Sequence, residues 1–399
     1  MEVNNDPREP GSRQTWVDVL RGFALAGVTI ANFNSYMEQQ VPENVLEGIN
    51  GPWGMALTGI NTVFLEWKFM TLFSILFGYG FGLILRNLGQ KGIAAGPFFV
   101  RRMAWLFVFG IIHALFWTGD VLHLYAISGL LLLPFRKLST RQLAWASAIC
   151  MFVLPTAVTF LFRGSPDHFG PAELDGYYMA LKQGGLTDVF RTNIQAYDLM
   201  FLRSGSDIHD IVETLGRFLL GYWLLRTGVW ENVTLKLGLF RKMTVALAVP
   251  AMAYFVVRYL AWKGRLDISS FLWEPFIKAG ILSASGLYCS ILARIYLNRP
   301  DARVMLLLRD MGRMTLTNYL LVSVVNIFLL YGIGLGQLGE WGQPVVWGCA
   351  ILWLIAEAFG SRSWLKAFRN GPMEWVWRQL TYQRRLPLRI KSVSGRANL

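Results

Sequence analysis

The chain has 399 residues, of which 54% are hydrophobic, 14% aromatic and only 16% charged, and its mean hydropathy is +0.39. Soluble domains usually carry about 25% charged residues, so this composition excludes an ordinary soluble protein. Several apolar runs reach the ~20 residues that are needed to cross a ~30 Å hydrocarbon core. The sequence therefore predicts an all-α, polytopic helical membrane protein.

The net charge of +13 does not indicate a nucleic-acid-binding protein, because the basic residues fall in short loops between apolar runs. The three cysteines, Cys150, Cys289 and Cys349, each lie inside an apolar run and show no paired spacing. They predict neither a disulfide framework nor a zinc site.

Ten apolar runs are predicted to be membrane spans. They cover about 17–37, 61–85, 98–117, 121–136, 142–162, 211–230, 243–261, 276–297, 313–334 and 342–360. The fourth run is short and follows a tight hairpin expected at residues 117–120. Lysine and arginine are concentrated in alternate loops, and the positive-inside rule places those loops and both termini in the cytoplasm.

These runs divide the chain into five regions. They are a cytoplasmic segment 1–16, a membrane region 17–162, an extracytoplasmic loop 163–210, a second membrane region 211–360 and a cytoplasmic segment 361–399. The loop is expected to form interfacial helices or to cover a cavity. Residues 364–380 predict a helix on the cytoplasmic surface. The basic tail is expected to attract anionic lipid, or to act only as a topology anchor, through Arg384, Arg385, Arg389, Lys391 and Arg396.

Ionisable side chains inside spans cost about 2.5 kcal/mol or more each, which makes them functional candidates. Asp18 and Arg21 are three residues apart, so they share a helix face and can pair. Arg21 either reaches lipid headgroups or binds a phosphate or carboxylate that arrives from the cytoplasm. Asn32 lies eleven residues after Arg21 on the same face, and it extends a polar track across this helix.

His113 is the strongest catalytic candidate, because it lies near the outer end of the third run among apolar neighbours. Asp120 follows seven residues later and can orient the imidazole, as general-base catalysis requires. His123 lies one turn further on. The alternative is a structural histidine that bonds a backbone carbonyl in a helix bundle. A metal site is not favoured, since nothing completes the ligand set.

Other polar residues in the spans favour structural roles. Glu213 and Arg217 have the order and spacing of a helical ion pair. The four-residue spacing of Gly78 and Gly82 is typical of close helix packing. A polar stripe in the ninth run is more typical of hydrogen bonding between helices than of a substrate path; its members are Thr315, Asn318, Tyr319, Ser323 and Asn326. The P-loop pattern of ATP-driven pumps is absent from the sequence.

Several short stretches, in this order, resemble the YeiB-like family of bacterial membrane proteins, also called domain of unknown function 418. They are residues 18–25, residues 68–78, His113-Ala114-Leu115 with Gly119-Asp120 and Tyr125-Ala126, residues 312–320, and residues 371–378 with Thr381-Tyr382. The resemblance extends over nearly the whole chain and implies a multi-pass protein of the bacterial inner membrane. It places the family's characteristic domain in region 211–360.

The stretch from Asp18 to Gly22 is also similar to the opening of membrane acyltransferases, which pass an acyl group from cytoplasmic coenzyme A to an acceptor on the other side. Those enzymes often carry a histidine at the position of Asn32. This resemblance implies acyl-coenzyme A as a co-substrate, with no bound cofactor. The expected partners are the lipid bilayer, a small-molecule, lipid or glycan acceptor and, in a homo-oligomer, a second copy of the chain.

The leading hypothesis is therefore acyl transfer across the membrane. Arg21 would hold the donor, assisted by Asp18, Asn32 and Asn318. His113, oriented by Asp120, would deprotonate the acceptor, while Lys68 or Arg217 stabilises the oxyanion. The main alternative is a secondary transporter or exporter in which His113 and Asp120 relay protons. A lipid-binding or assembly protein without turnover is the third hypothesis.

Overall fold

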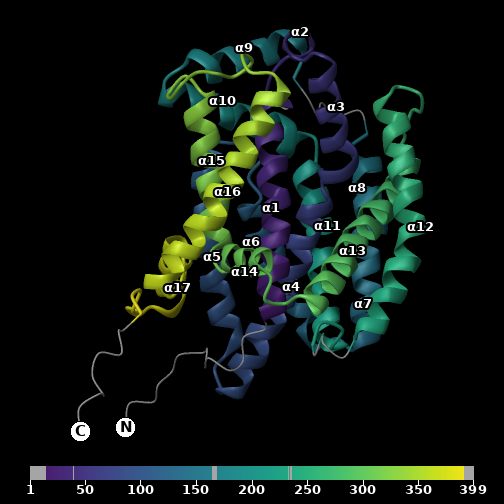
Figure 1. The fold of residues 1–399 in the computed structure, drawn as a ribbon, viewed down its shortest axis with the longest axis vertical. Helices are drawn as coiled ribbons and strands as arrows, with labels where there is room; N and C mark the ends of the chain where they lie inside the picture. The colour runs from purple at the N-terminus through teal and green to yellow at the C-terminus, as the bar shows by residue number, and fades with distance from the viewer. Residues whose placement is uncertain (1–14, 39, 164–168, 232, 234–235, 391–399) are drawn as a thin grey trace.

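The computed structural model describes residues 15–38, 40–163, 169–231, 233 and 236–390. These residues form helices and an isolated bridge between Phe368 and Arg389, and no β-strand occurs among them. Most helices run along the long axis of the molecule, and shorter ones lie across its two ends (Figure 1). The prediction of an all-α fold is confirmed.

The helices, in chain order, have the following bounds. They are α1 (Thr15–Glu38), α2 (Glu43–Ile49), α3 (Pro52–Ile60), α4 (Lys68–Gln90), α5 (Ala95–Ala114), α6 (Leu122–Leu131), α7 (Thr140–Ala148), α8 (Leu154–Leu161), α9 (Pro171–Gln183), α10 (Leu186–Tyr197), α11 (Ser206–Arg226), α12 (Leu237–Trp262), α13 (Glu274–Asn298), α14 (Arg303–Gly312), α15 (Thr315–Leu330), α16 (Gln343–Ala367) and α17 (Pro372–Tyr382). Short π-helical turns join α3 to α4 and α7 to α8.

Within the described residues, seven helical segments are long and apolar enough to cross a membrane. They are Thr15–Glu38, Pro52–Gln90, Ala95–Ala114, Thr140–Leu161, Leu237–Trp262, Glu274–Asn298 and Gln343–Ala367. They coincide with seven of the ten predicted spans. The segment Pro52–Gln90 contains a break at Trp67, whose φ of 66° is left-handed and directs α4 away from the preceding turns.

The predicted number of ten spans is not confirmed, and the three remaining segments differ from full spans in different ways. α6 has 10 residues, which is too short. α15 has 16 residues and reaches spanning length only together with α14, to which it is bent by 87°. α11 is long enough, but acidic and basic side chains interrupt its apolar sequence.

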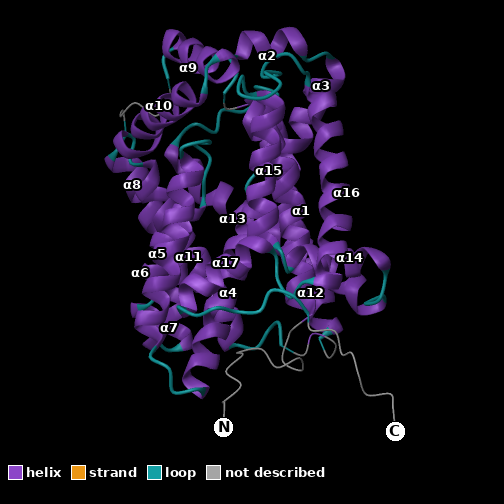
Figure 2. Ribbon diagram, turned by 90° about the vertical axis from the view of Figure 1, so that its left-hand side faces the viewer, coloured by secondary structure: helices purple, strands orange, loops and turns teal. Residues whose placement is uncertain are grey.

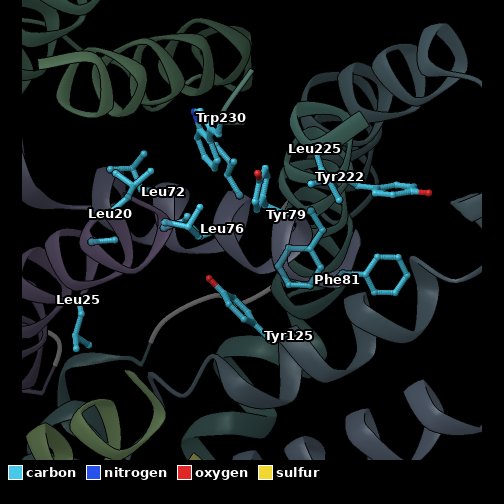
Figure 3. Close-up of a cluster of buried hydrophobic side chains, with 14 of the residues drawn as sticks. Leu20, Leu25, Leu72, Leu76, Tyr79, Phe81, Tyr125, Tyr222, Leu225 and Trp230 are labelled. Atoms are coloured by element: carbon cyan, nitrogen blue, oxygen red, sulfur yellow. The ribbon is translucent and has the colours of Figure 1, made fainter. Parts of the chain in front are cut away.

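α1 lies at the centre of the bundle and α12 at its edge (Figure 1). The main core joins residues of α1, α4, α6 and α11, and its large side chains include Leu20, Leu76, Tyr79 and Phe81 (Figure 3). α12 instead points valines outward, with Val245 and Val249 72% and 75% exposed. Such an apolar outer face fits a lipid environment and not water.

Glycines let two pairs of helices meet backbone to backbone. A Cβ atom on Gly22 of α1 would overlap the carbonyl of Leu308 in α14, and one on Gly312 would overlap the carbonyl of Asp18. At Gly78 of α4 a Cβ atom would overlap the backbone of α11. The packing interpretation of Gly78 is therefore correct, and the crossing of α1 with α14 fixes the position of Asp18 and Arg21.

The long loop forms α9 and α10, which cover the end of the molecule opposite to α17 (Figures 1 and 2). Helices were expected there; residues 164–168 lie outside the described ones. The helix predicted at 364–380 is interrupted, because α16 ends at Ala367 with Phe368 in an extended conformation and α17 begins at Pro372, after Gly371. α17 buries Trp377 and Arg378 in the protein. Lys391 and Arg396 lie outside the described residues.

Because the α1–α14 crossing leaves no room for a methyl group, we expect Gly312→Ala to destabilise the protein by about 1–3 kcal/mol. Unfolding of the purified protein in detergent, followed by tryptophan fluorescence against temperature, measures this change. Gly360→Ala is the matched control, since nothing lies within 4 Å of the methyl group that it adds. Equal unfolding temperatures for the two variants would contradict the close crossing.

Candidate functional site

The turn between α5 and α6 holds a carboxylate shared by two histidines. His113 Nδ1 lies 2.6 Å from Asp120 Oδ1, and His123 Nδ1 lies 2.7 Å from Asp120 Oδ2. The backbone N–H of His123 also donates to Asp120 Oδ2, at 3.1 Å. All three side chains are buried. Because a carboxylate only accepts hydrogen bonds, each imidazole carries a proton on Nδ1. The structure thus brings together the predicted His113 and Asp120.

Gly110 allows this turn to close on α5. A Cβ atom at Gly110 would overlap the backbone nitrogen of His123 and lie 3.0 Å from Asp120 Oδ2. The close approach of the two backbones places the Asp120 carboxylate against the end of α5, within reach of His113.

α15 supplies the partner of the other His113 nitrogen. Ser323 Oγ lies 2.7 Å from His113 Nε2, so the hydroxyl donates to the unprotonated nitrogen. Tyr319, one turn earlier, has its ring centroid 5.3 Å from that of His113, and its hydroxyl accepts from the backbone N–H of Val121 at 3.4 Å. Sequence reasoning noted Ser323 only as part of a stripe. The 210 residues between Ser323 and His113 gave no signal of their contact.

The hydrogen bonds continue from His123 toward α10 and α11. His123 Nε2 lies 2.7 Å from the Tyr197 hydroxyl, which donates in turn to Asp207. α10 also covers the end of α5, because Asn193 donates to the carbonyl of Leu115 at 3.0 Å. We call the whole sequence of contacts the polar chain; it comprises Ser323, His113, Asp120, His123, Tyr197 and Asp207. Tyr197 and Asp207 were not identified from the sequence.

A cavity of about 360 Å³ lies between α1, α4, α5, α6, α15 and α17. Five arginines line the cavity where α1 begins and α4 ends, and we call this part of the cavity the arginine end. The five residues are Arg21, Arg86, Arg102, Arg313 and Arg378. The middle is walled by apolar side chains that include Leu25, Met70 and Phe77. Val121 and Tyr319 also line the cavity, and the Tyr319 ring centroid lies 5.3 Å from that of His113.

The arginine end is built from several elements. Arg21 pairs with Asp18 at 3.2 Å, as their spacing predicted. The Arg102 guanidinium lies 3.5 Å from the centroid of the Trp377 ring, and Arg378 donates to Asn370 Oδ1 at 3.0 Å. Arginines outnumber acidic residues among the described lining, so the cavity favours an anionic ligand. Arg21 lines the cavity, whereas His113 lies behind Tyr319 and does not.

Glu374 of α17 holds the first turn of α15. Its carboxylate accepts from the backbone N–H groups of Leu316 and Thr317 at 2.6 and 3.1 Å, and from the Thr317 hydroxyl at 2.6 Å. Burial raises the pKa of Glu374, although the hydrogen bonds from Thr317 and Leu316 lower it. These bonds satisfy donors that a helix start leaves unpaired, and they fix α17 against the cavity.

The other predicted site residues lie apart from His113. Lys68 donates to the carbonyl of Thr62 at 3.1 Å and lies over the Tyr254 ring. Asn318 donates to Ser361 Oγ at 2.9 Å. Asn32 is buried, and its amide nitrogen has no hydrogen-bond partner within the part of the chain that the structure describes. Lys68 therefore contacts the helix break before α4, where it satisfies a backbone carbonyl.

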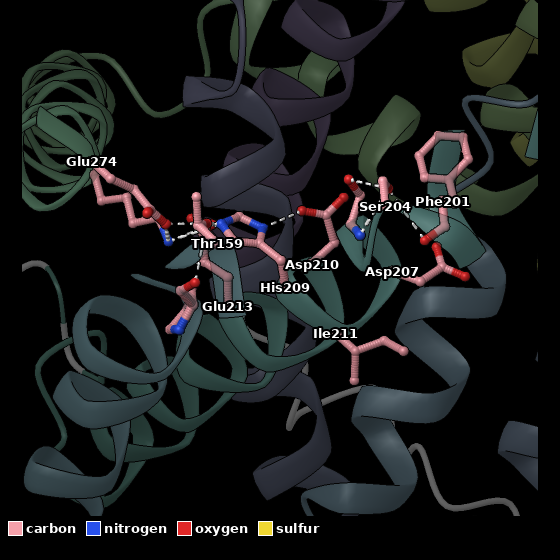
Figure 4. A network of polar contacts seen from close by, with 12 residues as sticks. Thr159, Phe201, Ser204, Asp207, His209, Asp210, Ile211, Glu213 and Glu274 are labelled. Atoms are coloured by element: carbon pink, nitrogen blue, oxygen red, sulfur yellow. Dashed lines mark hydrogen bonds and ion pairs between the residues drawn. The ribbon is translucent and has the colours of Figure 1, made fainter. Parts of the chain in front are cut away.

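Arg217 belongs to a second network on α11 and α13, through its pair with Glu213; Figure 4 shows Glu213, His209 and Glu274 of this network. It pairs with Glu213, as predicted, and Lys278 lies 3.4 Å from Glu213 and 2.5 Å from Glu274. His209 bonds Glu274 at 3.0 Å. His209 and Lys278 were not identified from the sequence. Lys278 and Arg217 pair with Glu213 and Glu274, while His209 also bonds Asp210 at 2.8 Å.

Comparison with known proteins identifies the family. Residues 224–384 match the model of a family described as protein of unknown function DUF418. YxaH of Bacillus subtilis (strain 168) is 28% identical over 400 residues, which cover 94% of this chain and 96% of YxaH. YeiB of Escherichia coli (strain K12) is 26% identical over 400 residues, with 92% and 96% covered. Residues 224–384 thus match the DUF418 family, and the chain as a whole is similar to YeiB-like proteins.

A third relative is described as an uncharacterized 39.9 kDa protein in the amylase 3′ region of Bacillus acidopullulyticus. It is 28% identical over 392 residues, and the match covers 97% of this chain and 99% of that protein. The predicted YeiB-like family is thereby confirmed. The DUF418 match contains Tyr319, Ser323 and Glu374, whereas Arg21 and His113 precede it. The polar chain and the cavity therefore join both halves of this DUF418 protein.

We expect Glu374→Ala to destabilise the protein by about 2 kcal/mol, because it leaves buried N–H groups of α15 without an acceptor. Thermal unfolding in detergent measures the loss. Glu374→Gln should retain most of the stability, since its amide oxygen can accept the same N–H groups. Glu340→Ala, which removes a carboxylate with a largely exposed side chain, is the control. An unchanged unfolding temperature in Glu374→Ala would refute the capping role.

Proposed function

We propose that this protein is an acyltransferase of the bacterial inner membrane, which transfers an acyl group from cytoplasmic acyl-coenzyme A to a hydroxyl or amine acceptor at the opposite face. The observation that carries the proposal is the cavity. It has arginines at one end and apolar walls in the middle, and it ends at Tyr319, whose ring packs on the imidazole of His113.

The composition of the cavity suits a thioester of coenzyme A. Guanidinium groups bind phosphates through charge-assisted hydrogen bonds, and Arg21, Arg102 and Arg378 would hold the phosphates of the donor. The apolar walls would accommodate the pantetheine arm and the acyl chain. The positive-inside rule assigns the start of α1 to the cytoplasm, which is where acyl-coenzyme A is available.

The polar chain supplies the base. An imidazole is a good general base when a carboxylate fixes its orientation, and Asp120 bonds His113 in that way. The seven apolar helices support a multi-pass membrane protein. The acceptor would approach from the end that α9 and α10 cover. Lys68 and Arg217 bind elsewhere, so we assign neither of them to the oxyanion.

The donor site makes a first prediction. We expect the Kd of acetyl- or longer acyl-coenzyme A to rise about tenfold or more in Arg21→Ala, because one charge-assisted hydrogen bond contributes about 1.5–3 kcal/mol. Calorimetry on the protein in nanodiscs measures this. Arg226→Ala, an arginine outside the cavity lining, should bind like the wild type. Absence of binding by any acyl-coenzyme A to the wild type would refute the donor site.

The base makes a second prediction. We expect His113→Gln to lower the rate of acyl transfer by about 10²–10⁴-fold, while acyl-coenzyme A still binds with wild-type affinity because His113 does not line the cavity. Transfer of a radiolabelled acyl group by purified protein, beside the calorimetric titration, separates the two effects. Full transfer activity in His113→Gln would eliminate His113 as the base.

Proton-coupled transport is the second candidate, and the polar chain is the observation that favours it. Hydrogen-bonded groups run from Ser323 to Asp207, as a proton relay requires. Substrate flux in proteoliposomes that follows an imposed pH gradient, without a covalent product, would decide for the transporter and against acyl transfer.

A further inference from the structure

We infer that Ser323 is a nucleophile that carries the acyl group covalently between donor and acceptor. This inference rests on the proposed acyltransferase function and deepens it, because it assigns a modification site and a two-step reaction. It starts from the observation that both ring nitrogens of His113 are occupied within the protein.

The contacts of His113 are those of an activated serine. Asp120 accepts from Nδ1 at 2.6 Å, and Ser323 Oγ donates to Nε2 at 2.7 Å. A nucleophile within hydrogen-bond distance of a base, which a third group orients, is the general arrangement of nucleophilic catalysis. An external acceptor cannot reach Nε2 while Ser323 occupies it. The hydroxyl that His113 is placed to deprotonate is therefore that of Ser323.

Ser323 lies close to the end of the cavity. It follows Tyr319 by four residues on α15, which is about 6 Å along the helix axis, and Tyr319 lines the cavity. Tyr319 lines the cavity and Ser323 does not, so along α15 the Tyr319 ring marks the end of the cavity that is nearer to Ser323. A donor whose phosphates bind at the arginine end would have to displace this ring for its acyl carbonyl to meet the Ser323 hydroxyl.

A buried donor near His113, the Trp117 indole N–H, points to a missing carbonyl ligand. Trp117 Nε1 has no hydrogen-bond partner among the described residues, although its side chain is more than nine-tenths buried, and Tyr36 is buried beside it. Their rings stack with centroids 4.4 Å apart, and the Trp117 ring lies 5.8 Å from that of His113. The Tyr36 hydroxyl lies within hydrogen-bonding reach of Ser323 and is not an unpaired donor. An unpaired buried donor is costly, and a thioester carbonyl or its oxyanion would satisfy the Trp117 N–H.

The reaction balances in two steps. In the first, Ser323 Oγ forms a bond to the acyl carbon, the carbon–sulfur bond of the thioester breaks, and the serine proton passes through His113 Nε2 to the coenzyme A thiolate. In the second, the acceptor hydroxyl forms a bond to the acyl carbon and the serine ester bond breaks. The proton of the acceptor passes through His113 Nε2 back to Ser323 Oγ.

The first test needs no acyl donor. A serine activated by His113 and Asp120 should react with diisopropyl fluorophosphate, and mass spectrometry of the digested protein should find the adduct on the peptide that contains Ser323. The adduct should be absent in Ser323→Ala and should form at least about 100-fold more slowly in His113→Gln. Ser290→Ala is the control, because Ser290 is equally buried but bonds Thr244 and a backbone carbonyl. A purely structural Ser323 would remain unlabelled in the wild type, and this result would overturn the inference.

The second test uses acyl-coenzyme A with a radiolabelled acyl group. We expect acyl label on Ser323 that is lost on addition of hydroxylamine or acceptor, and a hydroxylamine-labile thioester in Ser323→Cys. If the wild type transfers acyl groups and Ser323→Ala does so at the same rate, the carrier role fails while the proposed function stands. If the wild type neither binds nor consumes acyl-coenzyme A, the proposed function fails, and the acyl-carrier role fails with it even where fluorophosphate labels Ser323.

Discussion

The organisation of the molecule depends on one buried carboxylate. Asp120 accepts hydrogen bonds from both His113 and His123, and through them it connects the turn between α5 and α6 to α15 and α10. A carboxylate in an apolar interior is stable only when its lone pairs are satisfied. The turn must therefore approach α5 closely, which Gly110 permits. The need to satisfy the Asp120 carboxylate thus helps to bring α5 and α6 together with α10 and α15.

Buried charges elsewhere are balanced in different ways. On α11 and α13, Glu213 and Glu274 face Arg217 and Lys278, so each of these four charged groups has a partner of opposite sign. At the cavity, arginines outnumber the acidic residues of the described lining. Because removing one partner of a buried pair is costly, the first network needs no ligand. In the cavity, Arg21 pairs with Asp18 and Arg86 with Glu231, but five arginines line it beside two acidic residues, which is the basis for proposing an anionic ligand there.

Sequence reasoning succeeded where partners are neighbours on one helix or one turn. The pairs Asp18–Arg21, Glu213–Arg217 and His113–Asp120 follow from short spacings, and the structure contains all three. It failed where folding joins distant segments, because Ser323, Tyr197 and Glu374 reach partners 58 to 210 residues away. Apolar runs identified the long helices, but they overestimated α6 and α15, since hydropathy does not show where a helix stops inside the bundle.

These two short helices explain how polar groups come to lie inside the molecule. α6 and α15 have 10 and 16 residues, or about 15 and 24 Å, so each begins or ends between the faces of the bundle. Backbone that ends inside a membrane protein is tolerated only where protein or a cavity surrounds it. Here Glu374 satisfies the start of α15, and Asp120 satisfies the start of α6. α15 then carries Tyr319 at the end of the cavity and Ser323 at His113. The segments that least resemble membrane spans are therefore the ones that connect the cavity to the base.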